Sequence, residues 1–323
     1  MIAELNNQDR RKMIDTMDAL NRADVVIVQH EYGVYDGPDG ESIVEVLEDI
    51  ECPTIVVAHT VLMHPTPHQR SVLEAVVRAA DAVVVMTETG GVRLRSNFDV
   101  DVRKISVIPH GAAMSNAARF EDSKERPKLL TWGLLGPGKG IEWAIDALAL
   151  VDDLRPKPVY VVAANTHPKV QECEGDVYRD TLVQRAKNRR VDVVFDSEYL
   201  SLASLARLIS DSTMVILPYD SPDQVTSGVL VDAIAAGRPV IATAFPHAVE
   251  LLSSGAGIVV PRRDPKALAD AIRTALTTPG SVNAMASEAR RLAPDLTWPA
   301  IASRYAALGE KLLLNRAPLS VNQ

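Results

Sequence analysis

Short runs of apolar residues alternate with helical stretches along almost the whole chain, and this alternation constrains the fold more than any other feature. Each run is apolar at consecutive positions, which is typical of a strand that is buried on both faces. Helices between such strands are the connections that a parallel sheet requires. Ten runs have this character: Val25–Val28, Thr54–Ala58, Ala82–Met86, Ile105–Ile108, Lys128–Trp132, Pro158–Ala163, Val191–Phe195, Met214–Leu217, Val240–Thr243 and Gly257–Val260.

The pattern is interrupted between Ala112 and Arg126 by small and charged residues. At 323 residues the chain is also long for a single hydrophobic core. We therefore predict an α/β protein with two Rossmann-like, doubly wound parallel-sheet domains that face a cleft. The first domain is expected over residues 1–118 and the second over 119–297, followed by a C-terminal helix over 298–323.

Composition excludes several classes of partner and places the protein in the cytoplasm. The formal net charge of -8 argues against nucleic acid, whose phosphates need clustered Lys and Arg. The first twenty residues are too polar for a signal peptide, and no apolar run approaches the ~18 residues of a transmembrane segment. Cys52 and Cys173 fit a reducing compartment without structural zinc. The basic run 187–190 is interpreted as a solvated face, with peripheral contact to anionic lipid as the alternative.

Histidines concentrate in the loops that follow predicted strands. Ligands of open parallel sheets bind outside the carboxyl ends of the strands, which is where these loops lie. Because such loops occur in both predicted domains, we expect the site in the crevice between them. Five of the seven histidines are placed in this way: His30, His59, His110, His167 and His247.

The loop Ser221–Gly228 leads from a buried strand into a short helix. Its last residues, Thr226, Ser227 and Gly228, stand where unpaired backbone N–H groups and the positive end of the helix dipole favour a phosphate. Asp232 follows one turn later, and a carboxylate there can accept hydrogen bonds from ribose hydroxyls. This stretch therefore predicts a site for a nucleotide sugar.

A second glycine-rich turn lies between a predicted strand and a helix, at 133–140. Its glycines allow the backbone to approach an anion, and Lys139 supplies a point charge for phosphate. Gly133, Gly138 and Lys139 match the P-loop pattern, but Gly140 stands where Ser or Thr would hold magnesium. A P-loop nucleotidase is therefore a disfavoured alternative.

The segment Ala236–Thr243, with the sequence AGRPVIAT, resembles a signature of the retaining group 1 (family 4) glycosyltransferases of the GT-B fold. This resemblance implies that Lys139 clamps the donor diphosphate and that Asp232 contacts the ribose. Gln224 stands in place of a glutamate that contacts the donor sugar, and Leu134 replaces an arginine of the diphosphate clamp.

The resemblance extends into both predicted domains. Val57–Thr60 is similar to a segment with the acceptor-domain histidine, here His59, and Gln29–Gly33, with His30 and Glu31, is similar to a motif of one bacterial subgroup. His110, within Val107–Gly111, matches an interdomain turn. His247 and Glu250 stand where the family has a donor-contacting pair. Trp298 resembles the start of a last helix that crosses back to the first domain, and a simple capping helix is the alternative.

The resemblance implies transfer of a hexose from a nucleoside diphosphate sugar to an acceptor sugar, lipid or small molecule, with retention and without a metal or cofactor. His59, Gln224 and Lys139 are the expected catalytic residues. Family members begin with a further strand and a glycine-rich loop, so the first domain is expected to be incomplete. The alternatives are a degenerate nucleotide-sugar-binding paralogue and a sugar-nucleotide epimerase. The expected donor-binding residues are Gly133, Gly138, Lys139, Thr226, Ser227, Gly228, Asp232, His247 and Glu250, and the expected cleft residues are His30, Glu31 and His110.

Overall fold

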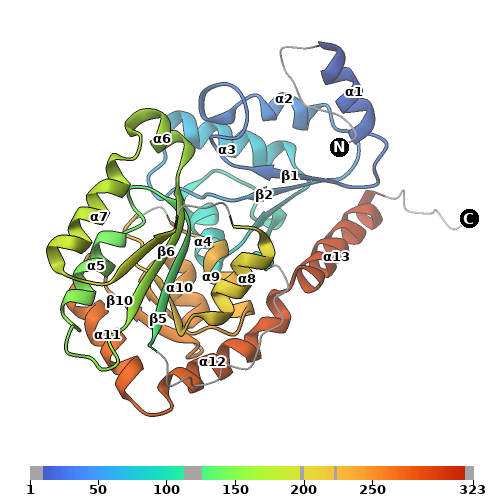
Figure 1. The fold of residues 1–323 in the computed structure, drawn as a ribbon. Helices are drawn as coiled ribbons and strands as arrows, with labels where there is room; N and C mark the ends of the chain where they lie inside the picture. The colour runs from blue at the N-terminus through green and yellow to red at the C-terminus, as the bar shows by residue number, and fades with distance from the viewer. Residues whose placement is uncertain (1–9, 113–125, 197–199, 222–223, 317–323) are drawn as a thin grey trace, which may run out of the picture. The chain divides into compact units, whose positions relative to one another are not determined.

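A computed structural model describes residues 10–112, 126–196, 200–221 and 224–316 of the chain (Figure 1). The chain divides into an N-terminal unit, Met1–Pro109 with Ile301–Gln323, and a C-terminal unit, His110–Ala300. The sequence-based boundary after residue 118 falls within 113–125, outside the described residues. Each unit is described below by itself.

The N-terminal unit is built on a four-stranded parallel sheet with the order β1-β2-β3-β4. One face packs against α2 and α3, and Ile301 of α13 packs on the other face against Ile55 and Val57 of β2. The elements are α1 (Arg10–Leu20), β1 (Val26–His30), η1 (Pro38–Gly40), α2 (Ile43–Glu48), β2 (Thr54–Ala58), α3 (Pro67–Ala79), β3 (Ala82–Val85), α4 (Glu88–Asn97), η2 (Val102–Lys104), β4 (Ile105–Val107) and α13 (Trp298–Arg316).

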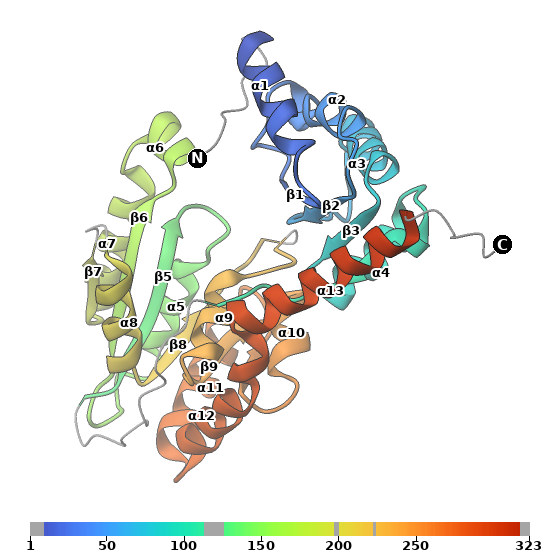
Figure 2. The same ribbon diagram turned by 90° about the vertical axis from the view of Figure 1, so that its right-hand side faces the viewer.

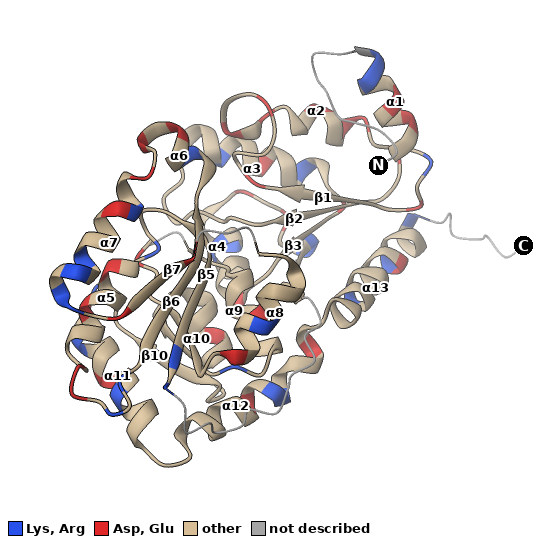
Figure 3. Cartoon of the chain, in the orientation of Figure 1, with Lys and Arg blue, Asp and Glu red and all other residues tan. Residues whose placement is uncertain are grey.

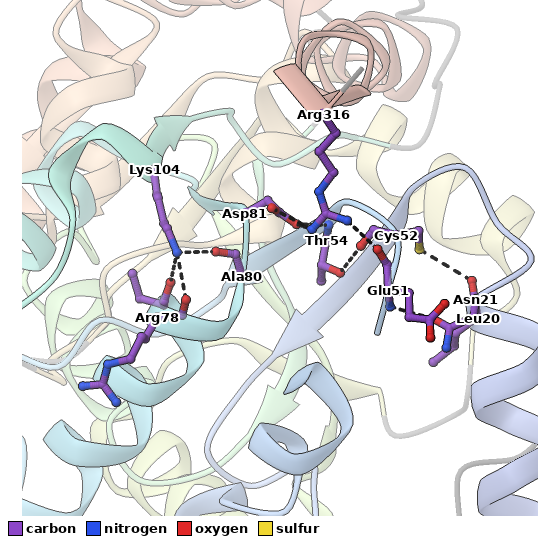
Figure 4. A network of polar contacts seen from close by, with 11 residues as sticks. Leu20, Asn21, Glu51, Cys52, Thr54, Arg78, Ala80, Asp81, Lys104 and Arg316 are labelled. Atoms are coloured by element: carbon purple, nitrogen blue, oxygen red, sulfur yellow. Dashed lines mark hydrogen bonds and ion pairs between the residues drawn. The ribbon is translucent and has the colours of Figure 1, made fainter. Parts of the chain in front are cut away.

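Polar contacts fasten the ends of α13 and α3 to this sheet (Figure 4). The Arg316 guanidinium lies 2.8 Å from the Asp81 carboxylate, which also accepts the backbone N–H of Thr54 at 2.8 Å. The ammonium of Lys104 donates to three carbonyls at the end of α3, at 3.2, 2.8 and 2.6 Å. Because the last carbonyls of a helix have no partner within it, Lys104 satisfies groups that would otherwise need water.

The C-terminal unit contains a six-stranded parallel sheet with the order β10-β9-β8-β5-β6-β7. Helices cover both faces of it, and α9 and α12 pack against one another (Figure 2). Its elements are β5 (Lys128–Leu135), α5 (Ile141–Ala149), β6 (Val159–Thr166), α6 (Pro168–Glu174), α7 (Val177–Arg189), β7 (Val193–Asp196), α8 (Leu202–Asp211), β8 (Met214–Leu217), α9 (Gly228–Ala235), β9 (Val240–Thr243), α10 (Pro246–Leu252), β10 (Gly257–Val260), α11 (Pro265–Thr277), α12 (Ser281–Leu292) and η3 (Ala293–Leu296).

The strand order of this sheet reverses at β5, which lies between β8 and β6. The helix after β5, α5, packs with α7 and α11 on one face, whereas the helix after β8, α9, packs with α10 on the other. Where the connections of two neighbouring strands leave toward opposite faces of the sheet, a crevice opens beyond the carboxyl ends of those strands. The crevice beyond β5 and β8 is therefore where the fold itself favours a ligand.

The predicted fold class is confirmed: both sheets are Rossmann-like and entirely parallel, and the ten predicted runs are the ten strands named above. Lys128 and Asp196 are the charged residues within these strands, and both signs of charge are interspersed over the helices (Figure 3). Among the described residues, no helix combines the length and apolar character that a membrane span needs.

Candidate functional site

The turn between β5 and α5 carries Lys139 to the carboxyl end of the sheet. Gly138 and Gly140 have φ angles of 88° and 67°, in the left-handed region that favours glycine. A Cβ atom on Gly140 would lie 1.8 Å from the carbonyl oxygen of Pro218, which follows β8. The turn can therefore approach the β8 loop this closely only because glycine occupies position 140.

Backbone hydrogen bonds join this turn to the β8 loop. The carbonyl of Gly138 accepts the N–H groups of Asp220 and Ser221, at 3.0 and 3.4 Å. The two sequence segments that predict phosphate binding thus lie together within one unit, at the crevice where the strand order reverses. Residues 222 and 223 of the predicted loop lie outside the described residues.

Lys139 is a half-buried cation whose side chain lies against an aromatic ring. Its ammonium nitrogen is 4.6 Å from the centre of the Tyr219 ring. Burial lowers the pKa of the Lys139 ammonium, because removal from water disfavours its charged form. Within the described parts of the chain it forms no ion pair with a carboxylate. A desolvated cation in this state favours an anionic ligand.

The first turn of α9 presents backbone donors at the same crevice. The Ser227 hydroxyl caps the helix by accepting the N–H of Leu230 at 3.2 Å. The N–H groups of Gly228 and Val229 have no hydrogen-bond partner in the described part of the chain. The buried Tyr219 phenol, whose pKa burial raises to about 12, interacts with the Ser227 side chain. Tyr219 therefore connects the lysine turn to the start of α9.

His247 fixes the backbone just before α9. Its side chain is buried, and its Nδ1 accepts the N–H of Ser227 at 3.1 Å. Burial, with a smaller effect from His110, lowers the pKa of His247 to about 4, although Glu250 acts in the opposite direction. The ring is therefore neutral near pH 7, with Nδ1 as the acceptor.

His110 packs on the same helix start. Its Nδ1 donates to the carbonyl of Gly111 at 2.6 Å, and its ring centre lies 5.6 Å from that of Trp298. A Cβ atom on Gly228 would lie 3.3 Å from Nε2 of His110. The His110 ring therefore lies against Gly228. The structure brings His110 and His247 together at the start of α9, which their positions after predicted strands did not indicate.

The titration of His247 makes stability depend on pH. An unfolded histidine binds a proton near pH 6.5, whereas folded His247 binds one only near pH 4, so acid favours the unfolded state. The contribution of neutral His247 to the free energy of unfolding is complete above pH 6.5. It falls by on the order of 3 kcal/mol as the pH drops to 4. Urea denaturation across this range should show the loss. In His247→Asn, whose amide oxygen can replace Nδ1 as acceptor, this part of the loss should disappear; an unchanged pH profile would contradict the assignment.

The other predicted donor-side residues lie in β5, in the loop before α9, and on α9 and α10. Gly133 of β5 lies under α9, where a Cβ would be 3.6 Å from Val229. Gln224 donates to the Thr226 carbonyl, so its amide orders the loop rather than remaining unbound. Asp232 is half-buried one turn into α9, and Glu250 is half-buried on α10, close enough to His247 to affect its pKa.

The predicted residues of the N-terminal unit form a separate cluster at the ends of β1 and β2. Nε2 of His59 lies 2.7 Å from Oε1 of Gln29. The Glu31 carboxylate accepts the Thr60 hydroxyl at 2.6 Å and the backbone N–H of Tyr32 at 3.1 Å. His30 is fully buried, and burial followed by the effect of His59 lowers its pKa to about 4. His59 and Glu31 are thus positioned by Gln29 and Thr60, whereas neither ring nitrogen of His30 has a hydrogen-bond partner among the described residues.

Other residues of the C-terminal site gave no signal in the sequence. Tyr219 bridges the two phosphate-binding segments, and Asp220 accepts the indole N–H of Trp143 and the Nε–H of Arg263, both at 3.2 Å. Tyr219 and Asp220 belong to no motif, and the partners of Asp220, Trp143 and Arg263, lie tens of residues away in the sequence. Among the described residues, no group of three or more His, Cys, Asp or Glu side chains could hold a metal ion.

Comparison with known proteins identifies one matching family and two sequence relatives. Residues 126–278 match the family described as glycosyl transferases group 1. A D-inositol 3-phosphate glycosyltransferase of Kineococcus radiotolerans is 26% identical over 281 residues, and one of Nocardioides is 25% identical over 246 residues. These matches cover 78% and 70% of this chain. The chain spans 62% and 52% of the length of these two relatives.

Solved structures share the fold at low sequence identity. The sucrose-phosphate synthase of Thermosynechococcus elongatus has a TM-score of 0.73 and 18% identity, with 97% of this chain and 81% of the other covered. Anabaena HepE in complex with UDP and glucose has a TM-score of 0.73 and 17% identity, with 93% and 82% covered. The chain thus has the GT-B fold of these proteins, and the part that matches the group 1 glycosyl transferases, 126–278, contains the lysine turn, Tyr219 and α9.

Proposed function

We propose that this protein is a glycosyltransferase that moves a hexose from a nucleoside diphosphate sugar to an acceptor hydroxyl, with retention of configuration and without a metal. The observation that carries the proposal is the Tyr219 bridge. One phenol ring lies under the Lys139 ammonium and interacts with the Ser227 cap of α9. A cation without a carboxylate partner and two backbone N–H groups without acceptors in the described chain are thereby gathered at one crevice.

These groups suit the diphosphate of the donor. During transfer, the bond between the anomeric carbon and the diphosphate oxygen breaks, and a bond from the acceptor oxygen to that carbon forms. The acceptor proton leaves with the nucleoside diphosphate or passes to solvent. Negative charge grows on the departing diphosphate, and preorganised donors at that position stabilise the transition state more than the ground state. Lys139 and the N–H groups of Gly228 and Val229 are the proposed donors.

We assign the remaining contacts in the same proposal. Asp232 binds ribose hydroxyls, Gln224 the donor sugar, and His247 and Glu250 support the loop and the donor. His59 is proposed to act at the transferred sugar, with His30 and Glu31 on the acceptor side. His110, packed over Gly228, shapes the phosphate end of the site. The amide of Gln224 contributes hydrogen bonds but no charge, so electrostatic stabilisation rests mainly on the diphosphate end.

The proposal is tested first by donor binding and then by transfer. UDP-, GDP- and ADP-sugars are screened for a rise in melting temperature, since a ligand that binds the folded state stabilises it by mass action. The donor that binds is then incubated with acceptors that include D-inositol 3-phosphate, the compound in the names of the two relatives. NMR of the product reports the anomeric configuration. Inversion would refute retention, and a chain that binds none of the donors would refute the proposal.

A second candidate is a nucleotide-sugar-binding protein without turnover. Leu134, at the position of the clamp arginine, is 48% exposed and offers no charge, and the Gln224 amide is engaged with the Thr226 carbonyl. Tight donor binding without transfer to any acceptor would favour this candidate. Conversion of the donor sugar without an acceptor would instead indicate an epimerase, and magnesium-dependent release of phosphate from ATP or GTP would indicate a nucleotidase.

A further inference from the structure

The proposed diphosphate site has one cation in its glycine turn, where two negative charges or more must be bound. Lys139 supplies a single ammonium, and Leu134 cannot add a second positive charge. A lysine is a point charge, whereas diphosphate recognition also benefits from the planar fork of an arginine. A guanidinium from another loop of the crevice would supply both the charge and the fork.

Arg263 comes to this crevice from the loop after β10. Its Nε donates to Oδ2 of Asp220 at 3.2 Å, and that carboxylate also accepts the indole N–H of Trp143 at 3.2 Å. The backbone N–H of Asp220 in turn donates to the carbonyl of Gly138 at 3.0 Å. One residue thus links the guanidinium to the turn that carries Lys139.

The two ends of this ion pair differ in their exposure. The Asp220 side chain is only 10% exposed, whereas that of Arg263 is 65% exposed. Nε is the atom of Arg263 that Asp220 binds, and the two Nη groups have no partner within 10–112, 126–196, 200–221 and 224–316. The Asp220 carboxylate thus binds the guanidinium at Nε, and the two Nη groups remain available for a ligand.

The backbone of Arg263 has an unusual conformation. Its φ angle of 56° lies in the left-handed region, which residues with a Cβ atom seldom adopt. Such conformations persist where the surrounding structure holds them, and they are concentrated at functional sites. Asp264, the next residue, caps α11 by accepting the N–H of Ala267 at 2.9 Å and so fixes the end of the loop.

We propose that Arg263 supplies the second cationic group of the diphosphate site, in place of the arginine that Leu134 replaces. Asp220 orients the guanidinium, and its Nη groups bind phosphate oxygens beside Lys139. This inference rests on the proposed function, because it assumes that the crevice receives a diphosphate.

The test compares Arg263→Ala with Arg262→Ala, a matched control whose Nη2 donates to the Ala244 carbonyl at 3.1 Å. Calorimetry measures binding of UDP, GDP and ADP, of the corresponding nucleosides, and of inorganic pyrophosphate. We expect Arg263→Ala to weaken diphosphate and pyrophosphate binding about tenfold, to leave nucleoside binding unchanged and to reduce the salt dependence of binding. Arg262→Ala should bind all probes as the wild type does.

Three results would overturn the assignment. One is diphosphate binding by Arg263→Ala equal to that of the wild type, and another is an equal loss for nucleoside and diphosphate, which indicates a structural role. The third is full recovery in the double variant Arg263→Ala with Asp220→Asn, since the arginine would then only screen the carboxylate. A wild-type chain that binds diphosphate but transfers no sugar would remove the enzyme proposal and leave Arg263 assigned. Absence of diphosphate binding to the wild type would overturn both.

Discussion

Lys139→Ala is expected to weaken binding of the matching nucleoside diphosphate by about 10- to 100-fold. A hydrogen bond to a charged group contributes about 1.5–3 kcal/mol, and about 1.4 kcal/mol corresponds to a factor of ten in affinity. The half-buried ammonium over Tyr219 is also desolvated before the ligand arrives, so little of its interaction with phosphate is offset by lost hydration. Isothermal titration calorimetry measures the difference directly.

The control for this variant is Lys187→Ala, which removes an exposed lysine of α7 in the same unit. It makes the same change in net charge, so it corrects for long-range electrostatics. Its affinity should equal that of the wild type. Unchanged affinity in Lys139→Ala, or an equal decrease in both variants, would show that the lysine turn does not bind the diphosphate.

Gly140→Ala is expected to produce the largest loss of stability of any substitution in the lysine turn. A Cβ atom 1.8 Å from the Pro218 carbonyl cannot be accommodated by a side-chain rotation, so the turn and the β8 loop must separate. We expect the C-terminal unit to lose at least about 3 kcal/mol of stability, with nucleotide binding lost as well. Thermal unfolding followed by circular dichroism, with and without ligand, measures both effects.

Gly280→Ala separates the steric effect from the backbone effect. Gly280 has a φ angle of 76°, close to the 67° of Gly140, but a Cβ atom there would meet nothing within 4 Å. This control should therefore lose only the cost of a left-handed alanine, about 1–2 kcal/mol, and should keep its ligand affinity. Equal stability losses in the two variants would mean that the contact with Pro218 is relieved elsewhere.

The strands were predictable because burial on both faces of a parallel sheet leaves continuous apolar runs in the sequence. Their ends were less predictable. The run Pro158–Ala163 becomes β6, Val159–Thr166, since its register with β5 continues to the pair Leu135 and Thr166 through the polar residues Asn165 and Thr166. Pairing with a neighbouring strand, rather than local composition, decides where this strand ends.

The parts of the site that were predictable are those formed by backbone groups, in the glycine-rich turn and at the start of α9. Glycines before Lys139 and a Ser cap before α9 are local signals, and the structure joins them at one crevice. No local pattern indicates that Pro218 occupies the space beside Gly140, or that Asp220 binds Arg263 from 43 positions away. Both relations depend on which strands are neighbours, and an order such as β10-β9-β8-β5 is not encoded in any single segment.

The division of the chain also bears on how the protein acquires its fold during synthesis. The N-terminal unit includes residues from Ile301 onward, and Ile301 is fully buried against β2. Segments nearer the N-terminus leave the ribosome first, so Ile55 and Val57 of this sheet stay uncovered until more than three hundred residues have been translated. During that interval the exposed aliphatic surface is a natural target for chaperones, and a fragment ending at Pro109 would keep that surface permanently.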